Sequence, residues 1–461
     1  MIRHIHFHHY ISFIIILFVF SGCKLGKKYA RPNIQLPETL DSTSVDSISI
    51  ADYNWEVIYT DTTLQALIHK TLDHNKDMMI AAARIKQLAA LKRIDHANMF
   101  PEIGARAYAK RERENYGGDD YSMDDEFDLK GTASWELDLW GKLRWTKDKS
   151  MAEFVGAIEN QRALQMSLIA QVAQSYFELV ALDNELSIVK KTVDARQESL
   201  HLARIRYEGG ITSEVPFRQA QVELARTTTL VPDLEKEITL KENEIALLTG
   251  EYPHNISRST LPEDIMFPVS LPVGLPSALL ERRPDIRQAE QKLIAANASV
   301  GIAYTSMFPN ISLTATYGLE SDLLSELLKS PHHLISGNLT QPIFAMGKNR
   351  ARLKASKAAY EQALYSYEKV VLSAFKDAYN AITEFNKAKE VYETRLRLEQ
   401  SAKSTLELIQ LQYISKVISY MDLLDAQRTY LDAQISLSNA IRDRQITLVN
   451  LYKALGGGWE Q

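Results

Sequence analysis

The feature that most constrains this chain of 461 residues is an internal repeat. Four residues return with the same identity at a constant offset of 206 positions (413 − 207 = 206). The pairs are Tyr207 with Tyr413, Ala220 with Ala426, Gln221 with Gln427, and Gly250 with Gly456. A constant offset over this length indicates two structural copies of one unit. Each copy is as large as a domain, so the period is far longer than that of a solenoid.

Composition and charge argue against two classes of protein. The chain is 45% hydrophobic and 24% charged, with a formal net charge of −5. These values are ordinary for a folded protein, and they predict no basic groove and no nucleic-acid partner. The sequence contains no phosphate-binding loop and no hydrolase or metalloprotease motif, so we predict that it is not an enzyme and holds no cofactor or metal. His332 and His333 are predicted to face solvent in a loop near Pro331 rather than to bind a metal.

The first residues have the pattern of an export signal. The apolar run from Tyr10 to Phe20 has the length of a signal-peptide core and is short for a membrane-spanning helix. The stretch Ser21, Gly22, Cys23 resembles the lipobox of bacterial lipoproteins, which implies cleavage and lipid attachment at Cys23. An uncleaved anchor with a buried thiol is the alternative. Cys23 is the only cysteine, so no disulfide can form within the chain.

The predicted organisation follows the repeat. Each copy is expected to contain a helix, a β-hairpin, a long helix and a returning helix. The predicted parts are a signal peptide (1–22), a lipidated extended leader (23–60), the first repeat (61–250), a proline-rich linker (251–276) and the second repeat (277–461).

Two segments without proline predict unusually long helices. They run from Lys142 to Glu208 and from Lys348 to Ile414, each 67 residues. A helix of this length would extend about 100 Å at about 1.5 Å per residue. Apolar residues recur every seventh position, which is typical of coiled-coil packing. In the first copy these residues are Val172, Leu179, Leu186, Val193 and Leu200; in the second they are Leu364, Val371, Ala378, Phe385 and Tyr392. Turns at Gly209, Gly210 and at Ser415, Lys416 lead into returning helices near 212–249 and 417–455.

Alternating segments follow each Phe–Pro pair and predict strands. They cover about 103–111 and 129–139 in the first copy, and 311–319 and 337–343 in the second. About ten residues suffice for a tilted strand to cross a bilayer. We interpret Trp135, Trp140 and Trp145 as an interfacial aromatic girdle, and the acidic stretch 115–128 as a solvated outer loop. Two soluble hairpins are the alternative.

Four strands cannot close a barrel, and unpaired backbone groups cost several kcal/mol each in hydrocarbon. The chain is therefore expected to share its barrel with other copies. Two, three or four copies would give eight, twelve or sixteen strands, and a conducting pore favours more than two copies.

Taken together, these residues resemble the bacterial outer-membrane efflux family, TolC-like, and its OprM and NodT lipoprotein branch. The resemblance covers nearly the whole mature chain. It rests on the lipobox, on the Arg283, Pro284, Asp285, Ile286 signature with Ala289 and Glu290, on the pairs Phe100–Pro101 and Phe308–Pro309, and on the stretch from Asp422 to Ala426.

The resemblance implies a fold and a function. The fold is mainly α with transmembrane β: a long helical coiled-coil barrel continued by a twelve-stranded β-barrel shared in a homotrimer. The function is a passive, gated outer-membrane channel for drugs, metal ions or other small toxic solutes. Its partners would be a periplasmic adaptor, a proton-driven inner-membrane pump and the lipid of the outer membrane. Type I protein secretion and a non-conducting structural lipoprotein that spans the periplasm are the alternatives.

The resemblance also implies a periplasmic gate. Asp422 and Asp425 match aspartates that line the family's constriction, and Tyr413 fits a gating tyrosine. A trimer would place three like charges at each aspartate position, favouring cations and raising the carboxylate pKa values. A pair of solvated helix carboxylates is the alternative. Two positions depart from the family pattern: Ile418 stands where the tyrosine's basic partner is expected, and Pro216 stands where the first copy would carry its acid.

Overall fold

The computed structural model describes residues 24–37, 49–115, 117, 122–259 and 274–459. The signal peptide and Cys23 lie outside the described residues. The chain divides into two compact units. Unit 1 comprises residues 1–34, 83–158 and 288–369, and unit 2 comprises 35–82, 159–287 and 370–461. Each unit therefore draws on both sequence repeats.

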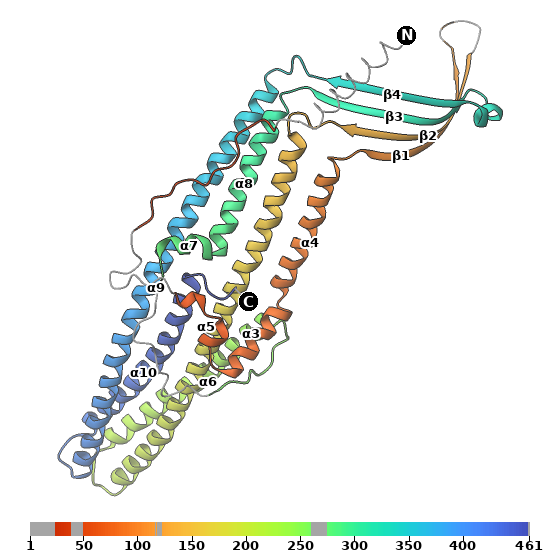
Figure 1. Ribbon diagram of the computed structural model, residues 1–461. Coiled ribbons are helices and arrows are strands. Elements are labelled where there is room, and N and C mark those ends of the chain that lie inside the picture. The colour runs from red at the N-terminus through yellow and green to blue at the C-terminus, as the bar shows by residue number, and fades with distance from the viewer. Residues whose placement is uncertain (1–23, 38–48, 116, 118–121, 260–273, 460–461) are drawn as a thin grey trace. The chain divides into compact units, whose positions relative to one another are not determined.

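The two 67-residue helices are confirmed with the predicted ends: α5 is Lys142–Glu208 and α9 is Lys348–Ile414. The described chain is mainly helical, with four strands (Figure 1). The other helices are η1 (Ile50–Asp52), α2 (Trp55–Ile58), α3 (Thr62–His74), α4 (Lys76–Ala97), α6 (Glu214–Leu248), α7 (Pro276–Arg282), α8 (Pro284–Thr305), η2 (Leu324–Lys329) and α10 (Tyr420–Ala454). Because η1 and α2 fall within the segment predicted as an extended leader, that prediction was wrong for residues 50–58.

Unit 1 contains one antiparallel sheet with the order β1-β2-β3-β4. The strands are β1 (Glu102–Glu114), β2 (Ser122–Glu136), β3 (Asn310–Ser321) and β4 (Pro331–Thr340). β2 pairs with β3, so the hairpins of the two repeats form a single layer (Figure 1). Within the described residues, β1 and β4 each keep one unpaired edge.

Two strand predictions were wrong in their limits. β2 begins inside the stretch predicted as an acidic loop, because its acids pair with basic residues on β1. Arg111 Nη2 lies 2.7 Å from Asp125 Oδ2, and Lys110 Nζ lies 3.1 Å from Asp124 Oδ2. Opposite charges facing each other across strands stabilise a sheet. β4 begins at Pro331 and ends before Pro342, which has no N–H to donate to a sheet.

The two faces of the sheet differ in chemistry. The register places apolar side chains of all four strands on one face, including Ile103, Leu129, Leu319 and Ile335. Ile103 and Ile335 are 82% and 84% exposed. Charged and hydroxyl side chains occupy the opposite face. Such a sheet can separate an apolar surrounding from an aqueous one.

The three tryptophans of the predicted girdle do not have the same surroundings. Each indole N–H donates to a backbone carbonyl within unit 1: Trp135 to Met99, Trp140 to Pro309 and Trp145 to Leu25. Trp145 is only 3% exposed, and a Cβ at Gly301 would lie 2.4 Å from its ring. The interpretation as an interfacial girdle was therefore wrong for Trp145, which is a core residue.

The first described residues are bound to this same region. Lys24 forms an ion pair with Asp148, and its Nζ lies 3.5 Å from the centre of the Trp145 ring. Arg31 donates to both carboxylate oxygens of Glu290, at 2.7 and 2.6 Å. The N-terminal segment is thus held against α5 and α8 from the residue that follows Cys23.

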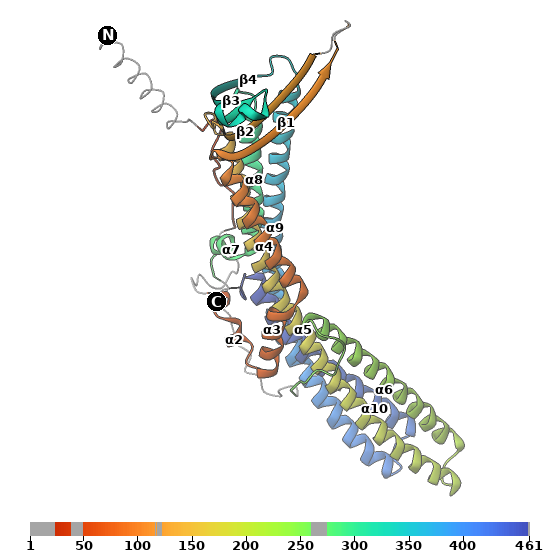
Figure 2. The same ribbon diagram turned by 90° about the vertical axis from the view of Figure 1, so that its right-hand side faces the viewer.

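Unit 2 is helical. Here α5 with α6 and α9 with α10 form two antiparallel helical hairpins (Figures 1 and 2). Five of the ten predicted seam residues are buried, namely Val172, Leu179, Val371, Ala378 and Phe385, and the other five are half-buried. The Arg283–Pro284–Asp285 segment joins the start of α8 to the end of α10. Pro284 begins α8, and Arg283 binds Asp285 and donates at 3.1 Å to the carbonyl of Ala454, near the end of α10.

Candidate functional site

The predicted gate residues lie together in unit 2, where α9 turns into α10. Tyr413 is in the last turn of α9, and Asp422 and Asp425 are in the first turns of α10. The turn is closed by Lys416, whose φ of 60° lies in the left-handed region. In the first copy the equivalent position is Gly210, with a φ of 70°. A lysine therefore adopts a conformation that glycine adopts without steric cost.

The Tyr413 side chain is buried in the core beside the turn between α9 and α10. It is 9% exposed and belongs to an apolar cluster with Phe217, Tyr420, Leu423 and Leu424. Its ring centre lies 5.7 Å from that of Tyr420. The Arg206 guanidinium lies 4.7 Å from the Tyr413 ring, which is cation–π geometry. A cation thus faces the predicted gating tyrosine from α5.

Ile418 packs against the same apolar cluster. It occupies the position where the family resemblance expects a basic side chain. Ile418 is partly buried and makes apolar contacts at a position where the family resemblance expects a charged side chain. The family's closing pair therefore has no counterpart at this position.

Asp422 has a local structural role. Ser419 precedes α10, and its Oγ accepts a hydrogen bond from the Asp422 N–H at 3.3 Å. In return, Asp422 Oδ2 accepts from the Ser419 N–H at 2.9 Å and from its hydroxyl at 2.7 Å. This reciprocal arrangement is a capping box, which satisfies two N–H groups at the helix start. The hydrogen bonds from Ser419 lower the pKa of Asp422.

The lowered pKa is opposite to the direction predicted from a ring of like charges. Within one chain the hydrogen bonds of the cap determine the shift. Asp422 and Asp425 are both exposed, whereas Leu423 and Leu424 between them are buried. The two carboxylates therefore point away from the apolar cluster, as either a pore lining or a solvated helix face requires.

The sequence analysis did not predict a cluster of charged residues that joins α5, α6 and α10. Arg196 of α5 and Glu223 of α6 have side chains that are 3% and 4% exposed, with 3.6 Å between Arg196 Nη1 and Glu223 Oε2. Arg428 of α10 forms a second ion pair with Glu223, and Gln427 accepts from Arg196 at 3.1 Å. Hydrogen bonding to Arg428 lowers the pKa of Glu223, whereas burial lowers the pKa of Arg196. The signal in the sequence was a mismatch between copies, because Ala402 and Thr429 stand at the equivalent positions.

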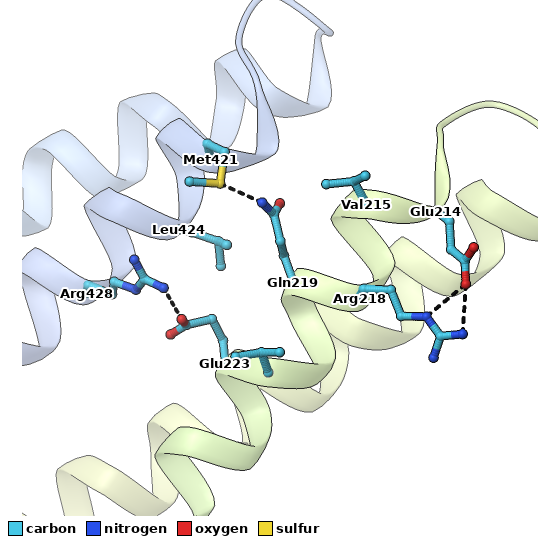
Figure 3. A pocket seen from close by; sticks show the side chains of 9 residues that line it. Glu214, Val215, Arg218, Gln219, Glu223, Met421, Leu424 and Arg428 are labelled. Carbon is cyan, nitrogen blue, oxygen red and sulfur yellow. Dashed lines mark hydrogen bonds and ion pairs between the residues drawn. The ribbon is translucent and has the colours of Figure 1, made fainter.

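A cavity of about 430 Å³ lies between α6 and α10 next to this cluster. Figure 3 shows Arg428 reaching Glu223 on one side and the Arg218–Glu214 pair on the other. The apolar part of the wall is formed by Val215, Val222, Met421 and Leu424. Both arginines of the wall are therefore paired, Arg218 with Glu214 and Arg428 with Glu223, and Glu223 also pairs with Arg196.

None of the helices described combines the length and the hydropathy needed to cross a membrane. In that same part of the chain, no group of three or more metal-ligating side chains is placed to hold an ion.

Comparison with known proteins identifies the family. The family described as "Outer membrane efflux protein" matches residues 67–251 and 275–457, one match for each repeat. The chain belongs to the outer membrane efflux protein family. The TolC-like resemblance and the predicted fold class, mainly helical with few strands and two internal copies, are confirmed.

Relatives and solved structures of this family match over nearly the full chain. The chain is 29% identical to "Cation efflux system protein CusC" of Escherichia coli O6:H1, covering 96% of this chain and 97% of the relative. It is 29% identical to "Probable outer membrane lipoprotein SilC" of Salmonella typhimurium, covering 97% and 98%. The solved structure of the outer-membrane channel OprN superimposes with a TM-score of 0.89 at 30% identity, covering 95% of this chain and 100% of that one. The predictions of an efflux channel and of an outer-membrane location are thereby confirmed. Members of this family transport solutes rather than catalyse reactions.

Proposed function

We propose that this efflux channel works as a homotrimer in which each chain contributes four strands to one twelve-stranded barrel. The single observation that carries the proposal is the sheet of unit 1. It has an apolar face, a polar face and unpaired edges on β1 and β4. Unpaired edge groups cost several kcal/mol each in hydrocarbon, so the edges require partner strands. Further copies of the chain supply them in a closed ring.

The channel is passive in this proposal. A proton-driven inner-membrane pump supplies the energy, and a periplasmic adaptor joins the pump to the helical end of the channel. The cargo is a drug, a metal ion or another small toxic solute. Support comes from CusC, whose name places it in a cation efflux system.

Cys23 is the proposed lipid attachment site, and the protein needs no other cofactor. Support comes from Lys24, which forms an ion pair with Asp148 beside the junction of sheet and helices. A lipid on the preceding residue would start close to that junction. Cys23→Ser should abolish labelling with a radioactive fatty acid such as palmitate, with wild-type protein as the control. Labelling that persists in Cys23→Ser would contradict this assignment.

Asp422, Asp425 and Tyr413 form the proposed periplasmic gate. In a trimer each exposed aspartate would give a ring of three carboxylates, which favours cations. Asp425 is the sharper probe because Asp422 also caps α10. We expect Asp425→Asn to weaken block of conductance by divalent cations, with Gln219→Asn, its equivalent in the first copy, as the matched control. Unchanged block in Asp425→Asn would place this residue outside the pore.

Assembly and conduction test the proposal together. Native mass measurement of detergent-extracted protein should give three times the mass of one chain, and the same preparation should conduct ions in planar bilayers. A conducting monomer would overturn the shared barrel, and a trimer that passes no ions would overturn the channel.

A further inference from the structure

A row of charged side chains crosses all four strands on the polar face of the sheet. Arg106 Nε lies 3.6 Å from Asp128 Oδ2, and Lys130 Nζ lies 3.4 Å from the same oxygen. Lys130 Nζ also lies 2.7 Å from Glu320 Oε2, and His332 Nε2 lies 3.3 Å from that carboxylate oxygen. We call these five residues the charged belt.

The strand register places the belt at one level of the sheet. Arg106 is opposite Lys130, and Asp128 is opposite Glu320. His332 is opposite Gly318, which is itself opposite Lys130. The belt therefore occupies two adjacent rows and runs from edge strand β1 to edge strand β4.

The two histidines of β4 lie on opposite faces of the sheet. His333 is opposite Tyr317, in the apolar row. His332 is in the polar row, and its side chain is 34% exposed. Its Nδ1 is buried and has no hydrogen-bond partner among the described residues. The prediction of a loop was therefore wrong, because both histidines are strand residues, whereas solvent exposure is confirmed for His333.

The charge of the belt depends on one imidazole. Arg106 and Lys130 carry two positive charges, and Asp128 and Glu320 carry two negative charges, so these four residues balance. His332 is the remaining titratable group of the belt, and a histidine changes charge between about pH 5 and 8. The charged residues of η2, the other element packed against β3, are Glu326 and Lys329, which lie 3.3 Å apart and pair with each other.

We propose that His332 controls the ion selectivity of the polar face, because its protonation turns a balanced belt into a positively charged one. This inference rests on the proposed trimeric barrel with its polar face inward. Three chains would then gain about three positive charges at one level of the lumen. A ring of charged side chains sets the selectivity of a pore, so the positive belt should reduce the passage of cations relative to anions.

The test is the reversal potential of the purified wild-type channel in a KCl gradient at pH 8 and pH 5.5. Both pH values lie above the ordinary pKa values of aspartate and glutamate. We expect the wild-type potential to shift towards anion selectivity at pH 5.5. His332→Gln should lose more than half of this shift, whereas His333→Gln, the matched control one residue away, should retain it. His332→Lys carries a fixed charge and should show the low-pH selectivity already at pH 8.

Each outcome decides the proposal. A full shift in His332→Gln, an equal loss in His333→Gln, or wild-type selectivity in His332→Lys at pH 8 would overturn the role of His332. If His332→Gln does not assemble, His332→Lys alone gives the answer. A wild-type trimer that passes no current would instead overturn the proposed function, which separates the two failures.

Discussion

In unit 2, each repeat has two helices joined by a short turn, but the charged residues near the two turns differ. In the first copy, Arg196 and Glu223 are buried as an ion pair. In the second copy the equivalent positions are Ala402 and Thr429, and the ionisable groups are instead the exposed Asp422 and Asp425. The two copies therefore share their helices, but the second has no counterpart of the buried Arg196–Glu223 pair at the equivalent positions.

The turns of the two copies differ in the same way. The first uses Gly210 in the left-handed region, and Ser213 makes no side-chain cap to α6. The third residue of α6 is Pro216, which has no N–H for a serine to cap. The second uses Lys416 in the left-handed region and a complete capping box between Ser419 and Asp422. The second turn therefore has an unfavourable backbone residue together with a better helix cap.

This comparison suggests that the two ends have different roles. In the first copy, the buried ion pair between Arg196 and Glu223 joins α5 to α6. Arg428 and Gln427 of α10 contact the same pair. The second copy presents carboxylates on a helix start that its own serine holds in place. The predictions below test this division, from the largest expected effect to the smallest.

Glu223→Ala should have the largest effect. It would leave Arg196 buried without a carboxylate, which typically destabilises a protein by about 3–5 kcal/mol. The measurement is the thermal unfolding of the full-length protein in detergent, followed by circular dichroism. Glu214→Ala is the control, because its pair with Arg218 is exposed and such pairs contribute at most about 1 kcal/mol. Equal melting temperatures for the two variants would show that the buried cluster does not stabilise this end.

Gly210→Ala and Lys416→Ala place the same side chain at equivalent turn positions. Gly210→Ala should destabilise the protein by about 1–2 kcal/mol, because it adds a Cβ to a left-handed residue. Lys416→Ala should have almost no effect, since that residue already has a Cβ. The same unfolding experiment measures both. A cost for Lys416→Ala as large as that for Gly210→Ala would mean that the lysine side chain, and not the backbone, determines the second turn.

Ser419→Ala and Ser213→Ala compare the two helix caps. Ser419→Ala should cost about 1 kcal/mol, the usual contribution of a serine N-cap. Ser213→Ala should cost only a few tenths, because its hydroxyl caps nothing. Hydrogen exchange at the first turns of α6 and α10 would locate the effect. Loss of protection at α6 in Ser213→Ala would contradict the observed difference in capping.

The pH dependence of Asp422 should give the smallest effect. Its pKa is lowered in the folded chain, so its contribution to stability is present above the ordinary aspartate range and is lost as the pH falls through the folded pKa. We expect wild type to melt above Asp422→Asn at pH 7 and the difference to shrink as the pH falls below the ordinary aspartate range. A ring of three carboxylates in the trimer would instead raise the pKa, and wild type would then melt below Asp422→Asn at pH 7. The sign of the difference at pH 7 therefore distinguishes a cap from a ring.

Periodicity predicted the helices well and the strands less well. Glycines mark both ends of α5 and the start of α9 in the sequence, and the repeat predicted the end of α9, where Lys416 takes the place of glycine. β2 and β4 were misplaced because opposite charges on paired strands extended one, and proline residues delimited the other. The charge effect cannot be seen in a single segment, since it depends on which strand lies opposite, whereas Pro342 is visible in the sequence and could have placed the end of β4.

The residues of the candidate site were likewise predicted only in part. Tyr413, Asp422 and Asp425 were found through a resemblance of motifs, and the structure places them within one turn region. Arg196, Glu223 and Arg428 were missed because they come from three helices and have no motif spacing. The girdle interpretation of Trp145 was wrong for a related reason: its slot is formed by Leu25 and Gly301, which are distant in sequence.

The sequence alone determined the duplication, the two long helices and the alternation of the strands, because each of these is a regular pattern along the chain. Only the tertiary structure decided which charges are buried, which face His332 occupies and what holds Asp422. These properties depend on contacts between distant segments, and the free energy of a charge depends on its surroundings rather than on its neighbours in sequence.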